Sequence, residues 1–186
     1  MGLTVVAIAI GLVVLFAIVR VYNRLVTFRN AVDRSFSTID VQLKLRCDLI
    51  PRVVDAVRGY MQHERDVLER LTSLRAAATA ATIDPATRLA LDTQMSGLLT
   101  RVFAVAEQYP DLKASAAVTM LQRSLNEVEA QIAAARRSYN ASVTDYNTAI
   151  EVFPAALVAV TFSFARRPLF EASAEDRGVP SASAHA

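Results

Sequence analysis

The side chains best suited to acid–base or metal chemistry are few. His63 is the one histidine beside an acid, Glu64, whereas His185 lies near the C-terminus and Cys47 is the single cysteine. A zinc site needs three or four converging ligands, often with histidines at i and i+4 of one helix. One cysteine and two histidines also fit no Ser–His–Asp or Cys–His catalytic set. We predict no catalytic, cofactor-binding or metal-binding residue, and a metal-dependent or other membrane-associated enzyme centred on His63 and Glu64 is the alternative.

One acidic residue interrupts an apolar heptad pattern. The pattern runs from Val53 to Leu74 in alternating steps of four and three residues, typical of a coiled-coil seam, and Glu64 occupies one position. A buried carboxylate requires a cation or a hydrogen-bond donor beside it. We predict that Glu64 is a buried residue that fixes helix register, and that its partner is one of three arginines: Arg46, Arg52 or Arg101.

A Tyr-Asn dipeptide occurs twice, one heptad apart, as Tyr139-Asn140 and Tyr146-Asn147. Buried tyrosine needs a partner for its hydroxyl, and asparagine is a poor helix former unless its side chain is hydrogen-bonded. Two readings follow. Asn140 and Asn147 are buried polar residues that set register in a core layer, or the repeat is a binding surface.

The segment 154–170 is apolar and then basic. Ten uncharged residues, 155–164, follow Pro154, too few to span a membrane, and Arg166 and Arg167 come after Ala165. Basic residues at this position suit anionic headgroups, so the segment either lies in the membrane interface or packs on the other helices as a short helix. The predicted contact residues are Phe153, Phe162, Phe164, Arg166 and Arg167.

The element that positions these residues at a membrane is the N-terminal stretch. Met1 to Val19 contains no charged side chain, and three arginines follow: Arg20, Arg24 and Arg29. The stretch lacks a basic start and a small-residue cleavage site, which distinguishes it from a signal peptide. We predict a transmembrane anchor at residues 1–20, with the N-terminus outside and the C-terminus in the cytoplasm, because cations favour the cytoplasmic flank.

Helical spacing of apolar residues continues to Phe153. Prolines divide this region: a kink or break at Pro51 with Asp48 as cap, a new helix at Pro85 capped by Asp84, and another after Pro110 capped by Asp111. We predict an all-α fold in which the anchor is followed by an elongated antiparallel up-and-down bundle over 21–153. It has about four long helices plus a short C-terminal helix, and 171–186 form a disordered tail.

Composition agrees with a helical membrane-associated protein. The sequence has 5 glycines and 6 prolines among 186 residues, which is sparse for a sheet protein with many turns. The net charge of +2 is too balanced to favour nucleic acid as a partner.

Several segments, in the same order, resemble the LemA family over roughly 20–171. They are residues 22–33 (YNRLVTFRNAVD), 39–44 (IDVQLK), 48–51 (DLIP), 59–64 (GYMQHE), 135–140 (ARRSYN), 145–147 (DYN), 153–154 (FP) and 167–171 (RPLFE). The departures from the pattern are Cys47 and the small-residue run 114–117. The resemblance implies one N-terminal membrane helix, a long antiparallel helical bundle and no established enzymatic activity.

These observations favour a non-enzymatic protein of the cytoplasmic membrane that acts as a protein–protein interaction scaffold or adaptor. The expected partners are the lipid bilayer, an unidentified membrane or cytoplasmic protein, and a second copy of the chain. A modulator of the bilayer, or of a neighbouring transporter or protease, acting through residues 153–167, is a further alternative.

Overall fold

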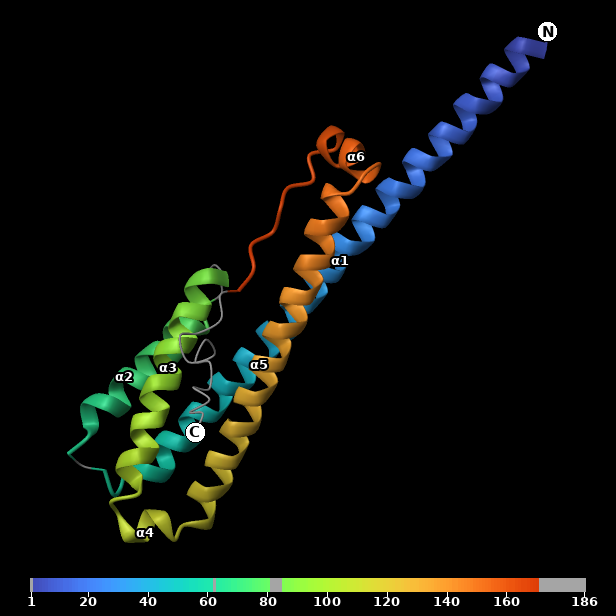
Figure 1. Ribbon diagram of the computed structural model, residues 1–186. Helices are drawn as coiled ribbons and strands as arrows, with labels where there is room; N and C mark the ends of the chain where they lie inside the picture. The colour runs from blue at the N-terminus through green and yellow to red at the C-terminus, as the bar shows by residue number, and fades with distance from the viewer. Residues whose placement is uncertain (1, 62, 81–84, 171–186) are drawn as a thin grey trace, which may run out of the picture. The chain divides into compact units, whose positions relative to one another are not determined.

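The computed structural model describes residues 2–61, 63–80 and 85–170, and its regular structure is helical throughout these ranges (Figure 1). The helices, in order, are α1 (Gly2–Val57), α2 (Arg65–Ala78), α3 (Pro85–Ala106), α4 (Pro110–Lys113), α5 (Ala116–Glu151) and α6 (Ala155–Thr161). The predicted all-α class is confirmed. The expected cap Asp84 and the expected disordered tail 171–186 lie outside the described residues.

The surroundings of α1 change along its length. Every residue from Gly2 to Arg20 is exposed, although none before Arg20 is charged. A helix that is apolar on all sides is suited to hydrocarbon rather than to water. Among the described residues, α1 alone is long and apolar enough to cross a membrane. Beyond this stretch, buried residues recur at helical spacing: Leu25, Val32, Ile39, Leu43, Cys47 and Ile50.

Pro51 lies inside α1, so of the predicted kink or break the break, with Asp48 as the cap of a new helix, is wrong. Proline has no N–H, and the carbonyl of Cys47, four residues earlier, therefore loses its helical donor. Nε of Arg75 in α2 donates to this carbonyl over 2.9 Å. A buried acceptor without a donor costs about 1–3 kcal/mol. The arginine supplies the missing donor, and α1 continues to Val57.

The chain reverses near Gly59 instead of continuing the heptad seam as one helix. The N–H groups of Tyr60 and Met61 both donate to the carbonyl of Val57, over 3.0 Å each, and α2 starts at Arg65. Val57 and Met61 are 1% exposed and share one core cluster with Leu68 of α2. A heptad pattern keeps apolar residues on one side whether the helix continues or folds back, so it could not indicate this turn.

The helix after Pro110 also starts later than predicted. Pro110 begins the four-residue α4, and α5 starts only at Ala116. Ser115 precedes α5, and its hydroxyl accepts a hydrogen bond from the N–H of Val118 over 3.4 Å. Serine is a preferred N-cap residue, so Ser115, and not Asp111, caps the long helix.

The chain divides into two compact units, which we call the terminal unit (Met1–Phe36 with Arg136–Ala186) and the central unit (Ser37–Ala135). The central unit holds one hydrophobic core, in which α2 packs against α3. Among the described residues of this unit, the most completely buried side chains come from α1 to α5 and the turn at Met61, and they include Ile50, Val53, Leu71, Met95, Val102, Leu112 and Ile132.

In the terminal unit α1 and α5 run antiparallel. The rings of Phe36 and Tyr139 lie 6.0 Å apart between centroids, whereas Tyr22, earlier in α1, lies 4.8 Å from Phe162, which comes after α5. The segment that follows α6 then returns along α5.

Ser163 makes that return possible. Its φ of 56° lies in the left-handed region, and it follows the C-cap of α6. The N–H groups of Ser163 and Phe164 donate to the carbonyls of Val160 (3.3 Å) and Ala159 (2.9 Å). This pairing closes a helix end and sends the chain back.

The Arg75 contact yields a stability prediction. We expect Arg75→Met to lower the free energy of unfolding of the full chain by about 1–2 kcal/mol, because the Cys47 carbonyl loses its donor. In a Pro51→Ala background the alanine N–H can donate a hydrogen bond to that carbonyl. Arg75→Met should therefore lower the free energy of unfolding by less in that background. Denaturation followed by circular dichroism measures both, and equal costs in the two backgrounds would contradict the explanation.

Candidate functional site

The two Tyr-Asn dipeptides hold the chain's own C-terminal segment, which we call the strap (Ala165–Phe170). The amide group of Asn147 donates to the carbonyl of Arg167 (2.9 Å) and accepts from its N–H (3.0 Å). Asn140 makes the same two bonds to Phe170, over 3.0 and 2.8 Å. Both asparagines are half-buried, so they bind the strap instead of setting register inside a core.

The tyrosines add a second pair of bonds with the same spacing. The hydroxyl of Tyr146 donates to the carbonyl of Ala165 (2.9 Å), and that of Tyr139 donates to Pro168 (3.2 Å). A seven-residue step along a helix rises about 10.5 Å, and three residues of extended chain cover about 10 Å. The seven-residue repeat on α5 therefore matches a three-residue repeat along the strap. The side chains of the repeat form hydrogen bonds with the backbone of the strap.

Aromatic contacts hold the far end of the strap. The ring of Phe170 lies 4.5 Å from that of Tyr139 and 6.3 Å from that of Phe36, between centroids. Desolvation raises the pKa of Tyr139, Arg167 opposes the shift, and Asp33 adds to it. The Tyr139 hydroxyl is thus a neutral donor at physiological pH, as its bond to the strap requires.

The residues predicted for membrane contact divide into two groups. Phe164 lies 5.7 Å from Tyr22 and beneath the guanidinium of Arg29, and Arg167 lies 3.5 Å from the carboxylate of Asp33. Both therefore face α1. Phe162 also contacts Tyr22, at 4.8 Å between ring centroids, but stays 52% exposed. Phe153 is 82% exposed, and the exposed Arg166 pairs with Glu151 over 3.0 Å.

The predicted partner of Glu64 is corrected by the structure. Glu64 is half-buried next to α2, and the hydroxyl of Tyr109 donates to its Oε2 over 3.4 Å. Desolvation raises the pKa of Tyr109, and the Glu64 carboxylate adds to the shift. His63 is exposed. Within residues 2–61, 63–80 and 85–170, no three His, Cys, Asp or Glu side chains are grouped to hold a metal.

A buried ion pair in the central unit was missed by the sequence reasoning. Arg46 and Asp92 are 1% and 2% exposed, and their side chains are 2.6 Å apart. Arg46 also donates to the hydroxyl of Ser96 (2.7 Å) and pairs with Glu129 of α5. Arg46, proposed from sequence as a partner of Glu64, thus joins α1, α3 and α5. The sequence signal that could have indicated the burial of Arg46 was its position between the core residues Leu43 and Ile50.

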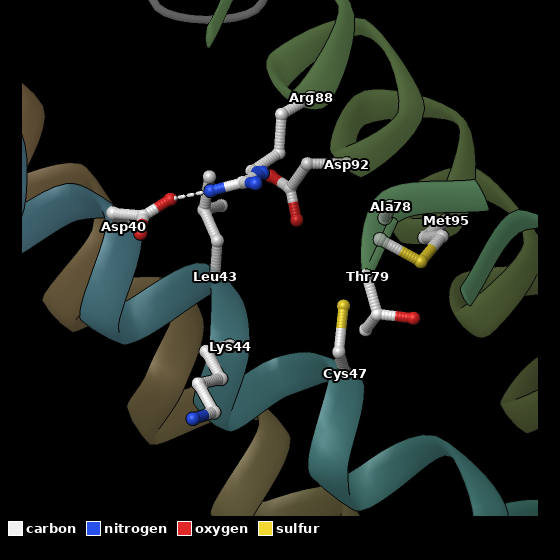
Figure 2. Close-up of a pocket in the computed structure, with 9 residues that line it drawn as sticks. All are labelled: Asp40, Leu43, Lys44, Cys47, Ala78, Thr79, Arg88, Asp92 and Met95. Atoms are coloured by element: carbon white, nitrogen blue, oxygen red, sulfur yellow. Dashed lines mark hydrogen bonds and ion pairs between the residues drawn. The ribbon is translucent and has the colours of Figure 1, made fainter. Parts of the chain in front are cut away.

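Beside this pair lies a cavity of about 250 Å³. Figure 2 shows Arg88 reaching Asp40 across its rim, with the Cys47 thiol on the wall. Its lining comes from three helices and the residue after α2: Asp40, Leu43, Lys44, Cys47, Ala78, Thr79, Arg88, Asp92 and Met95. Burial raises the pKa of Cys47, and Asp92 adds to the shift. A protonated thiol is a weak nucleophile, so the cavity wall offers no activated cysteine.

For the buried ion pair, we expect the loss of one partner to destabilise the chain more than the loss of both. We expect Arg46→Met to lower the free energy of unfolding by about 3–5 kcal/mol, because it removes the arginine that is paired with the buried Asp92 carboxylate. The double variant Arg46→Met with Asp92→Leu should recover much of this loss. Chemical denaturation of the full chain tests both, and a double variant no more stable than the single one would contradict the assignment.

Binding of the strap predicts a local effect without global unfolding. We expect Asn147→Ala to speed hydrogen exchange at the Arg167 amide roughly tenfold, since it removes two hydrogen bonds. Thr144→Ala is the matched control, because that hydroxyl bonds within α5, to Asn140. Unchanged exchange in Asn147→Ala, measured by NMR or mass spectrometry, would show that the asparagine does not hold the strap.

Comparison with known proteins identifies the family of the chain. A family model described as the LemA family matches residues 35–183. Protein LemA of Metamycoplasma hominis is 27% identical over 155 residues, covering 83% of this chain and 71% of that protein. Magnetosome protein MamQ of Magnetospirillum gryphiswaldense is 33% identical over 82 residues, covering 44% of this chain and 30% of that protein. Because the family model spans well over half of the sequence, the chain belongs to the LemA family.

Proposed function

We propose that this LemA-family chain is a non-enzymatic scaffold of the cytoplasmic membrane, crossing it once with its N-terminus outside. The observation that carries the proposal is the continuity of α1. One helix contains both the stretch apolar enough to cross a membrane and core residues of the folded protein, from Leu25 onward. The folded part therefore begins within a few residues of the membrane surface.

The charges after the apolar stretch support this orientation. Arg20, Arg24 and Arg29 follow 19 residues without a charge, and cationic residues concentrate on the cytoplasmic side of membrane helices. The strap and the central unit would then lie in the cytoplasm.

Protein binding is favoured over catalysis by the surfaces on the described helices. Val41 and Leu45 lie one turn apart on α1 and are 56% and 46% exposed, although both are apolar. By contrast, His63 is exposed and the polar contact of Glu64 is the Tyr109 hydroxyl, which gives no support to an enzyme centred there. The names of the relatives, Protein LemA and magnetosome protein MamQ, describe no reaction. A second copy or another membrane or cytoplasmic protein is the expected partner.

In-cell crosslinking tests the scaffold. A photo-crosslinking amino acid at Val41 or Leu45 should give discrete adducts, to another protein or to a second copy, identified by mass spectrometry. The matched control is Thr100, an exposed polar position on α3. The same adducts from Thr100, or none from Val41 and Leu45, would contradict a binding surface at this face.

The orientation is tested in parallel in a Cys47→Ala background. A membrane-impermeant maleimide should label Gly2→Cys in intact cells, and should label Arg123→Cys only after lysis. Labelling of Arg123→Cys from outside would reverse the proposed orientation.

A further inference from the structure

The turn between α5 and α6, and α6 itself, expose large apolar side chains. Leu157 and Val160 lie three residues apart on α6 and are 64% and 83% exposed. Phe153, in the turn before α6, is 82% exposed, and Phe162, directly after the helix, is 52% exposed. The opposite side of α6 is buried at Val158 and Ala159. The helix is therefore fixed by one face while it presents large apolar side chains on the other, and such patches mark contact sites.

This face lies where the apolar stretch of α1 ends. The ring of Phe162 contacts Tyr22 at 4.8 Å between centroids, and Phe164 contacts the same ring at 5.7 Å. Tyr22 is two residues beyond Arg20, the first charged residue of the chain. Figure 1 shows α6 beside this part of α1, within the terminal unit. Aromatic residues at such a level are typical of the boundary between hydrocarbon and headgroups.

The charges around α6 suit an anionic surface. Arg20 and Arg24 lie on either side of Tyr22 along α1, Arg29 lies over the ring of Phe164, and all three are exposed. Arg166 follows α6. Two acids offset part of this charge: Glu151 pairs with Arg166, and Asp33 pairs with Arg167. The net charge that remains is positive, which suits the anionic lipid headgroups of the cytoplasmic leaflet.

Geometry limits α6 to the surface of the bilayer. Its seven residues extend about 10 Å, against roughly 30 Å of hydrocarbon. The return at Ser163 and the bonds from Tyr146 and Asn147 then direct the chain back along α5.

We propose that Phe153, Leu157, Val160 and Phe162 insert into the interfacial region of the leaflet from which α1 emerges, as a second membrane contact. This inference rests on the proposed crossing of the membrane by α1. The occupant is lipid because the face adjoins the end of the spanning stretch and is flanked by cations. The strap, held through backbone bonds by the Tyr-Asn repeat, fixes α6 at that level.

Depth measurements on the full chain test the inference. In a Cys47→Ala background, an environment-sensitive fluorophore is attached at Val160→Cys, and the protein is reconstituted in vesicles of phosphatidylcholine with phosphatidylglycerol. We expect blue-shifted emission, strong quenching by nitroxide-labelled lipid and weak quenching by iodide. Ala141→Cys, exposed on α5 of the same unit, is the matched control and should show the opposite pattern. Omitting phosphatidylglycerol should weaken the lipid quenching at Val160→Cys.

A third label separates this inference from the proposed function. Leu12→Cys reports whether α1 lies in hydrocarbon. If the Leu12 label is quenched by lipid while the Val160 label is quenched by iodide, the second contact is overturned and the anchor stands. If the Leu12 label is open to iodide, the anchor itself is overturned. Shielding of Val160 from both quenchers would mean that protein covers α6, which also overturns the inference.

Discussion

The structure depends on one constraint, the change of environment along α1 between Val19 and Leu25. Before this point the helix is apolar on every side, and after it the helix buries one face and exposes charges on the other. The first part of this unbroken helix is therefore suited to hydrocarbon, and the second part to a folded protein in water. The terminal unit is built at this boundary. The ring of Tyr22 contacts the rings of Phe162 and Phe164, which follow α5 in the sequence. These contacts fix α6 at the level where the apolar stretch ends.

The strap gives the repeated Tyr-Asn dipeptide its role. An asparagine side chain carries a donating NH2 group beside an accepting carbonyl oxygen, so it can pair with both backbone groups of a single residue in an extended chain. Asn140 pairs in this way with Phe170, and Asn147 pairs with Arg167. These four hydrogen bonds involve only backbone groups of the strap. This explains why polar residues that disfavour helix interiors occur twice in the middle of α5. It also ties the C-terminal segment to the same unit that carries the apolar stretch of α1.

Periodicity in the sequence predicted the helical class and the apolar faces, and the run of uncharged residues predicted the apolar stretch of α1, because these features depend on local sequence. Features that depend on distant residues could not be predicted this way. Pro51 continues a helix because Arg75, in the next helix, serves the Cys47 carbonyl. The Tyr-Asn repeat was recognised, but its partner, an extended strap, has no periodic signal. Arg46 was named from sequence, yet its partner Asp92 is a single acid with nothing local to distinguish it.

Spin-label scanning along α1 of the reconstituted full chain tests the central claim most directly. Collision rates with oxygen, which concentrates in hydrocarbon, and with a water-soluble nickel complex would be measured residue by residue from Leu3 to Ile39. The account predicts uniformly high oxygen access and no nickel access within Leu3–Val19. Both rates should change abruptly near Arg20, and a helical period should appear beyond Leu25. Nickel access throughout Leu3–Val19, or the same helical period on both sides of Arg20, would contradict it.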